Sequence, residues 1–193
     1  MSDNFDKFKR ITIYGSTGSG KTTLTKKLSK ILGAKTIHLD DIFWGPNWEI
    51  PTRESFEKLV RKELTADSWV SDGNYSRVRN FVLDRATFAV ILVLPLPLII
   101  WRLIARSISR NTKIKLQKVT PLPKRVKDSG MGEQPIMAIL ELSYWAIKHR
   151  QKKLPVIIKE VKENLGENYL ILYHQSEVDE LVTKMALLTN KKK

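Results

Sequence analysis

Residues 15–22 read GSTGSGKT and fit the pattern Gly-x-x-x-x-Gly-Lys-Ser/Thr. The apolar stretch ITIYG at 11–15 precedes this segment, and residues 21–32, which carry leucines at helical spacing, follow it. Glycines let successive backbone N–H groups turn toward one anion, and the first turn of a helix adds partial positive charge. The order of strand, glycine-rich turn and helix therefore predicts a phosphate-binding loop. The alternative is a Gly/Ser turn with a solvated lysine.

We call residues 15–22 the phosphate loop. Lys21 is expected to reach the β- and γ-phosphates of ATP in a catalytic role, and the hydroxyl of Thr22 is expected to bind Mg²⁺. Such a magnesium site also takes an acid from the end of a neighbouring strand, and Asp72 supplies one. Alternatively, Asp72 is a turn aspartate before Gly73. The predicted nucleotide-binding residues of this segment are Gly15, Ser16, Thr17, Gly18, Ser19, Gly20, Lys21, Thr22 and Thr23.

Strand and helix patterns alternate along the chain. The predicted strands are 11–15, 35–39, 68–72, 87–94 and 168–173. Because parallel strands need crossover connections, this alternation predicts a parallel sheet with helices on its faces. The predicted fold class is α/β, a three-layer P-loop NTPase fold with a five-stranded, mainly parallel sheet. A length of 193 residues suits a single domain, 1–193.

The stretch HLDDIFW at 38–44 follows the second predicted strand. It therefore lies at the sheet edge where ligands of open α/β sheets bind. Asp40 directly ends the apolar run and is the predicted substrate-binding acid, whereas Asp41 is expected to face solvent or to cap a turn. Phe43, Trp44 and Trp48 are predicted to form an apolar wall for a ring-shaped substrate. The alternative is that the acids are turn residues and the aromatic side chains fill the core.

The net charge of +14 is concentrated, because every charged residue from Arg102 to Lys127 is Lys or Arg. This charge favours acidic partners such as phosphates, nucleic acid or anionic lipid. Arg102 and Arg106 are four residues apart and share one face of a helix predicted at 97–110. Arginines there can stabilise a transferring phosphoryl group, or the face is simply solvated. Residues 111–134 show no clean period and are predicted to be a mobile, basic, lid-like insert.

Other features of the sequence argue against disulfides, thiolate or histidine metal sites, membrane-spanning helices and secretion signals. The chain has no cysteine, so it forms no disulfide and no thiolate metal site. The most apolar stretch, 88–101, is interrupted by two prolines and is too short for an ordinary spanning helix. The first ten residues contain no apolar leader region. The three histidines, at 38, 149 and 174, lack metal-ligand spacing and are predicted to be structural or exposed. We expect a cytoplasmic protein without an integral membrane segment.

The segments GSTGSGKTT, HLDDIFWGPNW and WVSDGNYS, with the arginine helix, resemble the adenylate-kinase-like P-loop proteins. They look most similar to the DNA topology modulation proteins. The third strand of adenylate kinases ends in Asp-Gly-x-Pro-Arg; here Asp72 and Gly73 match, the proline is absent and Arg77 falls one residue later. The resemblance implies that Arg77 holds an acceptor phosphate. It also implies that Arg102 lies near the adenine and phosphates, and that Arg106 acts on the transferring phosphoryl group.

The stretch around Asp40 also resembles P-loop kinases of nucleosides and small metabolites, in which an acid here contacts the acceptor hydroxyl. Asp40 would then be catalytic, as it accepts or orients the hydroxyl proton. The leading hypothesis is a Mg²⁺-dependent kinase that transfers the γ-phosphoryl group of ATP to a nucleotide, nucleoside or other small hydroxyl metabolite. The alternative is a nucleic-acid-binding protein, acting through residues 102–127, in which nucleotide is a regulator.

Overall fold

Five parallel strands form the centre of the molecule. The computed structural model describes residues 5–44, 51–113, 143–144 and 146–190, with the backbone alone described for residues 5, 106–113 and 149. The strands are β1 (Arg10–Gly15), β2 (Lys35–His38), β3 (Trp69–Asp72), β4 (Phe88–Leu92) and β5 (Tyr169–Leu172). They lie in the order β2-β3-β1-β4-β5, and every neighbouring pair is parallel. The predicted five-stranded parallel sheet is confirmed.

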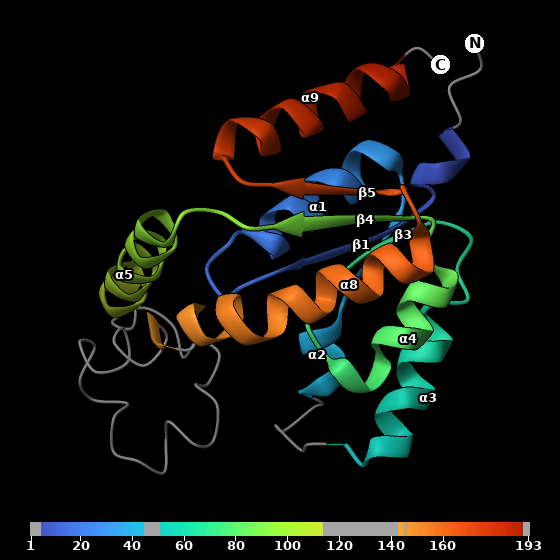
Figure 1. Cartoon of the computed structure of the whole chain (residues 1–193), viewed down its shortest axis with the longest axis horizontal. Coiled ribbons are helices and arrows are strands. Elements are labelled where there is room, and N and C mark those ends of the chain that lie inside the picture. Colours follow the sequence, from blue (N-terminus) through green and yellow to red (C-terminus); the bar gives the residue numbers. More distant parts are fainter. Residues whose placement is uncertain (1–4, 45–50, 114–142, 145, 191–193) are drawn as a thin grey trace.

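Helices cover both faces of this sheet and make three layers (Figure 1). The α-helices are α1 (Lys21–Leu32), α2 (Leu39–Phe43), α3 (Arg53–Glu63), α4 (Ser76–Arg85), α5 (Leu96–Lys113), α8 (Leu154–Leu165) and α9 (Gln175–Asn190). A short 3₁₀ turn (Phe5–Phe8) precedes β1, and a π-helical turn (His149–Lys153) leads into α8. The first face carries α1 and α9, and the second carries α4 and α8.

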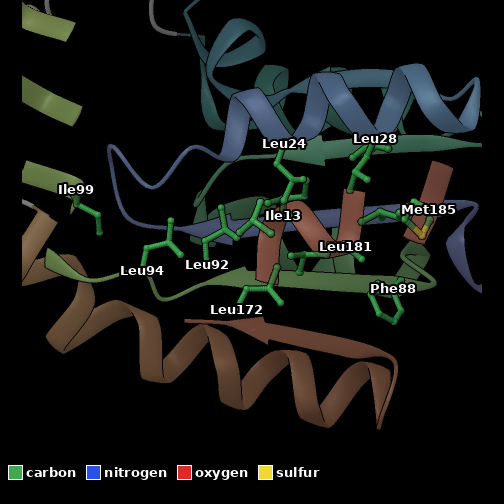
Figure 2. Packing of buried hydrophobic residues seen from close by; sticks show 14 of the residues in the cluster. Ile13, Leu24, Leu28, Phe88, Leu92, Leu94, Ile99, Leu172, Leu181 and Met185 are labelled. Atoms are coloured by element: carbon green, nitrogen blue, oxygen red, sulfur yellow. The ribbon is translucent and has the colours of Figure 1, made fainter. Parts of the chain in front are cut away.

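The core on the first face follows the alternation of side chains along the strands. Ile11 and Ile13 of β1 point toward α1 and α9, where they are buried with Leu28 and Met185 (Figure 2). Because successive strand residues point to opposite faces, Tyr14 points the other way and packs in the cluster with α4 and α8. Both faces of β1 are therefore buried, which explains why its sequence reads as a continuous apolar run.

A buried ion pair joins the two helices of the second face. The Nη1 of Arg79 in α4 donates to Oε2 of Glu160 in α8 at 2.7 Å, and the Arg79 side chain is only 5% exposed. A charge this deep is stable only when it is paired. The pair therefore fixes α4 against α8 on the face opposite the phosphate loop's helix.

The carboxyl ends of all five strands meet at one edge, since all pairs are parallel. The backbone register places Gly15 beside Leu92, and places His38 and Ile13 on either side of Asp72. Helix α5 lies beyond this edge in Figure 1. The segments that carry the predicted site residues are thereby brought together.

Two sequence-based boundaries are corrected. Asp40 and Asp41 do not lie in a loop, because residues 39–43 form the one-turn helix α2 directly after β2. Helix α5 continues to Lys113 and so includes the first residues of the predicted insert at 111–134; residues 114–134 lie outside the described part of the chain. Among the helices that the structure describes, none has the length and apolar character needed to cross a membrane.

We predict that Leu28→Ala lowers the free energy of unfolding by about 2–5 kcal/mol, because it opens a cavity beneath α1. Leu28 is 0% exposed, whereas Leu187 on α9 is 59% exposed. Leu187→Ala is the matched control and should change stability by about 0.5 kcal/mol or less. Urea unfolding of both variants measures the difference. Equal effects of the two substitutions would contradict the assigned core.

Candidate functional site

The phosphate loop connects β1 to α1 by a backbone path that requires glycine. Gly18 and Gly20 have φ angles of 80° and 92°, in the left-handed region, and Gly20 is the residue before the first turn of α1. The Nζ of Lys21 folds back over the loop and donates to the carbonyl oxygens of Gly15 at 2.9 Å and Ser16 at 3.0 Å. The loop is thus a compact turn whose lysine lies over it, at the N-terminus of a helix.

Helix α5 contacts the same loop. A Cβ atom added to Gly18 would lie 3.0 Å from Cγ of Leu103 and 3.2 Å from Cγ2 of Ile99, so a larger residue there would require these side chains to shift. From the same helix, Nη1 of Arg102 donates to the carbonyl oxygen of Ser19 at 3.2 Å. The structure therefore places the Arg102 guanidinium at the phosphate loop, and its predicted role toward a nucleotide stays a prediction.

Two further residues hold this arrangement and were not predicted from the sequence. The Nδ2 of Asn74, which follows the β3 strand, donates to the carbonyl oxygen of Gly15 at 2.6 Å. The Oε1 of Gln175, at the start of α9, accepts from Nη2 of Arg102. Both residues lie two or three positions after the carboxyl end of a strand, and this position in the sequence could have indicated that they lie at the site.

A cavity of about 420 Å³ opens over the loop and the first turns of α1. Its charged lining residues are Lys21, Lys27, Arg102 and Asp40. Three cations around one carboxylate suit a ligand with several negative charges and one group that needs a hydrogen-bond acceptor. The remaining lining residues are Thr17, Gly18, Ser19, Gly20, Thr22, Thr23, Leu24, Leu103, Gln175 and Val178.

Asp40 and Asp41 face different places. Asp40 lines the cavity of the phosphate loop, and its Oδ1 accepts a hydrogen bond of 2.8 Å from the Tyr75 hydroxyl. Burial, and then the nearby Asp40 charge, raise the pKa of Tyr75 well above its usual value, so the phenol keeps its proton and stays a donor. Asp41 instead lines a separate hollow with His38 and Glu63. The two acids therefore line different hollows, and the substrate-binding role of Asp40 stays a prediction.

Asp72 lies at the end of β3, buried and beside His38. The Nδ1–H of His38 donates to Oδ1 of Asp72 at 2.8 Å. His38 therefore orients the carboxylate of a predicted metal ligand. The Oδ2 of Asp72 has no hydrogen-bond partner among the described residues. Because a buried carboxylate oxygen without a partner is costly, this atom suits a cation or a water bound to one.

The residues present fit Mg²⁺ bound together with a nucleotide. The described residues hold no cluster of three or more His, Asp or Glu that would cage a metal by itself. Mg²⁺ commonly takes only one or two protein oxygens and completes its shell with phosphates and water. Thr22 lines the cavity, whereas Asp72 is not among its lining residues; Asp72 lies at the end of the strand next to β1 and has an unpartnered Oδ2 among the described residues.

Eight predicted site residues are not among the described residues that line the cavity: Gly15, Ser16 and Asp72 at the strand ends, and five others, which are considered next. Trp44 ends α2 with its ring edge-on to Phe43, at a centroid distance of 5.2 Å, and is not among the described lining residues. Arg77 is exposed on the first turn of α4 and is also not among them. The side chain of Arg106 and the whole of Trp48 lie outside the description. The roles of these four residues stay predictions, whereas Phe43 packs against the core.

The strand order and the glycine-rich loop at the end of β1 decide the fold. The chain has a P-loop NTPase fold. A shikimate kinase from Acinetobacter baumannii in complex with shikimate matches 100% of this chain and 99% of its own, with a TM-score of 0.51 and 21% identity. A shikimate kinase from Bacteroides thetaiotaomicron matches 94% of this chain and 98% of its own, with a TM-score of 0.54 and 17% identity.

At these identities the likeness concerns the P-loop fold. No protein-family model matches the chain, and no curated protein sequence matches it. The resemblance to DNA topology modulation proteins therefore stays a prediction. So does nucleic-acid binding through residues 102–127, of which 114–127 lie outside the described residues.

We predict that Gly18→Ala destabilises the protein by more than Gly33→Ala does and weakens ADP binding at least tenfold. Both glycines have positive φ, 80° and 62°, so both substitutions carry the backbone strain of about 1–2 kcal/mol. Only Gly18 also meets α5, because nothing lies within 4 Å of an added Cβ at Gly33. Urea unfolding and calorimetric titration with ADP measure both effects. Identical behaviour of the two variants would contradict the contact between α5 and the loop.

Proposed function

We propose that the protein is a kinase that transfers the γ-phosphoryl group of ATP to a hydroxyl group of a small molecule. One observation carries the proposal: the carboxylate of Asp40 lines the same cavity as the phosphate loop and Arg102. A phosphoryl-transfer site needs a phosphate cradle, cations and an acceptor for the proton of the attacking hydroxyl. These groups share one space in this protein, at the carboxyl edge of the sheet.

The triphosphate of ATP would lie along residues 15–23, with its charge opposite Lys21 and Arg102. Helix α1 directs its first N–H groups at the same place and adds the partial positive charge of its dipole. Thr22 and Asp72 would hold Mg²⁺, which supplies charge neutralisation between the β- and γ-phosphates when it is bound. Arg106, on the same helix as Arg102, is proposed to act on the transferring group.

The chemistry is an in-line displacement. The acceptor hydroxyl gives its proton to the carboxylate of Asp40 while its oxygen forms a bond to the γ-phosphorus. The bond between that phosphorus and the bridging oxygen breaks, and ADP leaves with the electron pair. Lys21 and Arg102 stabilise the charge that spreads over the equatorial oxygens. Closure of the residues around the cavity would exclude water as a competing acceptor.

The acceptor is a small molecule in this proposal, and Arg77, Trp44 and Trp48 are proposed to contact it. A shikimate kinase with the same fold was solved with shikimate, a hydroxylated small acid, which makes shikimate a reasonable first probe. A nucleoside and AMP represent the other acceptor classes. ATP and the acceptor are the proposed partners, and Mg²⁺ is the proposed cofactor.

We expect the wild-type protein to release ADP from ATP and Mg²⁺ faster in the presence of one acceptor of this panel than without it. Lys21→Ala should abolish turnover, because the lysine contacts the transferring phosphates. Asp40→Asn should lower kcat by about 10²–10⁴-fold, because the amide accepts no proton. A coupled assay of ADP release measures all three proteins. Removal of Mg²⁺ with EDTA should abolish turnover and be reversed by added Mg²⁺.

Asp41→Asn is the matched control, since Asp41 is the next residue but lines a different hollow. It should keep wild-type turnover, and Asp40→Asn should keep the wild-type affinity for ADP. The proposal fails if no acceptor raises the wild-type rate above that of Lys21→Ala, or if the two aspartate variants lose activity equally.

A further inference from the structure

Tyr75 forms the only side-chain hydrogen bond assigned to Asp40 within the described residues, and this contact points to a role for the tyrosine. Its hydroxyl lies 2.8 Å from Oδ1 of Asp40, and the two residues are 35 positions apart in the chain. Asp40 belongs to α2 after β2, and Tyr75 precedes α4 after β3. The bond therefore ties together two neighbouring strand ends at the cavity.

We propose that Tyr75 is the positioning residue of the acceptor site: it holds one oxygen of Asp40, so that the other oxygen receives the proton of a neutral hydroxyl group. This inference rests on the proposed kinase function and specifies its acceptor as an alcohol rather than a phosphate or carboxylate. Tyr75 itself acts through Asp40.

The core of the protein fixes the Tyr75 ring. Its centroid lies 4.8 Å from that of Phe43 and 5.2 Å from that of Phe56. Phe56 is 1% exposed and belongs to a buried cluster that includes Val60 and Val78. Because aromatic rings packed in this way do not swing freely, the position of the hydroxyl is set by the core. Asp40 is exposed, and its carboxylate is oriented by the hydrogen bond to Tyr75, whose ring packs against that buried cluster.

The charges around the pair decide which way the hydrogen bond runs. The raised pKa of Tyr75, caused first by burial and then by Asp40, keeps the phenol protonated. The phenol is then the donor and the carboxylate is the acceptor. Lys21, Lys27 and Arg102 are the cations that line the same cavity, and Asp41 points to a separate hollow. Asp40 is therefore the one carboxylate that meets the acceptor among the described lining residues.

This arrangement distinguishes classes of acceptor. A carboxylate with one oxygen occupied by a donor can accept one further proton at its free oxygen, and a neutral hydroxyl provides that proton. When the attacking oxygen belongs to a phosphate or carboxylate, it has no proton to give at neutral pH and is repelled by the charge of Asp40. Transfer to the phosphate of AMP should therefore be slow, whereas a hydroxyl group of shikimate meets the requirement.

The first test needs no turnover. Tyr75→Phe keeps the packed ring and removes only the donor hydroxyl, and Asp40→Ala removes the acceptor oxygen of the same hydrogen bond. Urea unfolding of the two single variants and the double variant forms a double-mutant cycle. We expect the effects to be non-additive, because the second substitution removes a bond that the first has already lost. Additive effects would overturn the proposal. Tyr169→Phe, in the edge strand β5, is the matched control and should be additive with Asp40→Ala.

The second test measures ADP release from ATP and Mg²⁺ with shikimate, with AMP and with water alone. Tyr75→Phe should lower kcat about tenfold with the KM for ATP unchanged, and should have no further effect in the Asp40→Asn background. A merely structural role would lower stability and affect both backgrounds alike, which overturns the proposal. A faster rate with AMP than with shikimate also overturns it. If the wild-type protein shows no turnover with any acceptor while the unfolding cycle is non-additive, the proposed kinase function fails, and this role of Tyr75 fails with it.

Discussion

The parallel pairing of β1 with β3 and β4 is the constraint on which the rest of the molecule depends. Parallel pairs send every chain segment back across a helix, so all five strands end at the same edge. The register puts Asp72 beside Ile13 and His38, and puts Gly15 beside Leu92. The residues that follow the five strands are therefore brought together at this edge by the strand order itself.

The carbonyl oxygen of Gly15 is the point where these segments are joined. Lys21 from α1 and Asn74 from the turn after β3 both donate to it. Arg102 holds the other end of the loop at Ser19, and Gln175 of α9 accepts from the same guanidinium. The loop is thus held by α1, by the turn after β3 and by α5, whose Arg102 is in turn bonded to Gln175 of α9. These contacts preorganise the loop N–H groups for an anion without relying on the loop sequence alone.

The hydrogen-bonded pair of Asp40 and Tyr75 is linked to the core by aromatic packing. Phe56 and Phe43 fix the ring of Tyr75, and its hydroxyl reaches Asp40. Asp40, predicted to follow directly on the second strand, lies on the one-turn helix α2 next to a buried cluster. A rigid support of this kind is what an acid at a reacting centre requires, because small displacements of such a group are costly to the rate.

The sequence by itself determined the α/β class, the five strands and the glycine-lysine pattern of the phosphate loop, because these follow from local patterns: apolar runs, helical spacing, and glycines before a lysine. The preference for Asp40 over Asp41, and the role of Arg102 that the family resemblance implies, stay predictions. The contacts of Asn74, Gln175, His38 and Tyr75 were decided only by the tertiary structure. Each joins residues separated by 34 to 73 positions, and no local pattern encodes which strand ends become neighbours. Which strand ends become neighbours is set by the strand order β2-β3-β1-β4-β5. This order forms only when helices pack on both faces of the sheet.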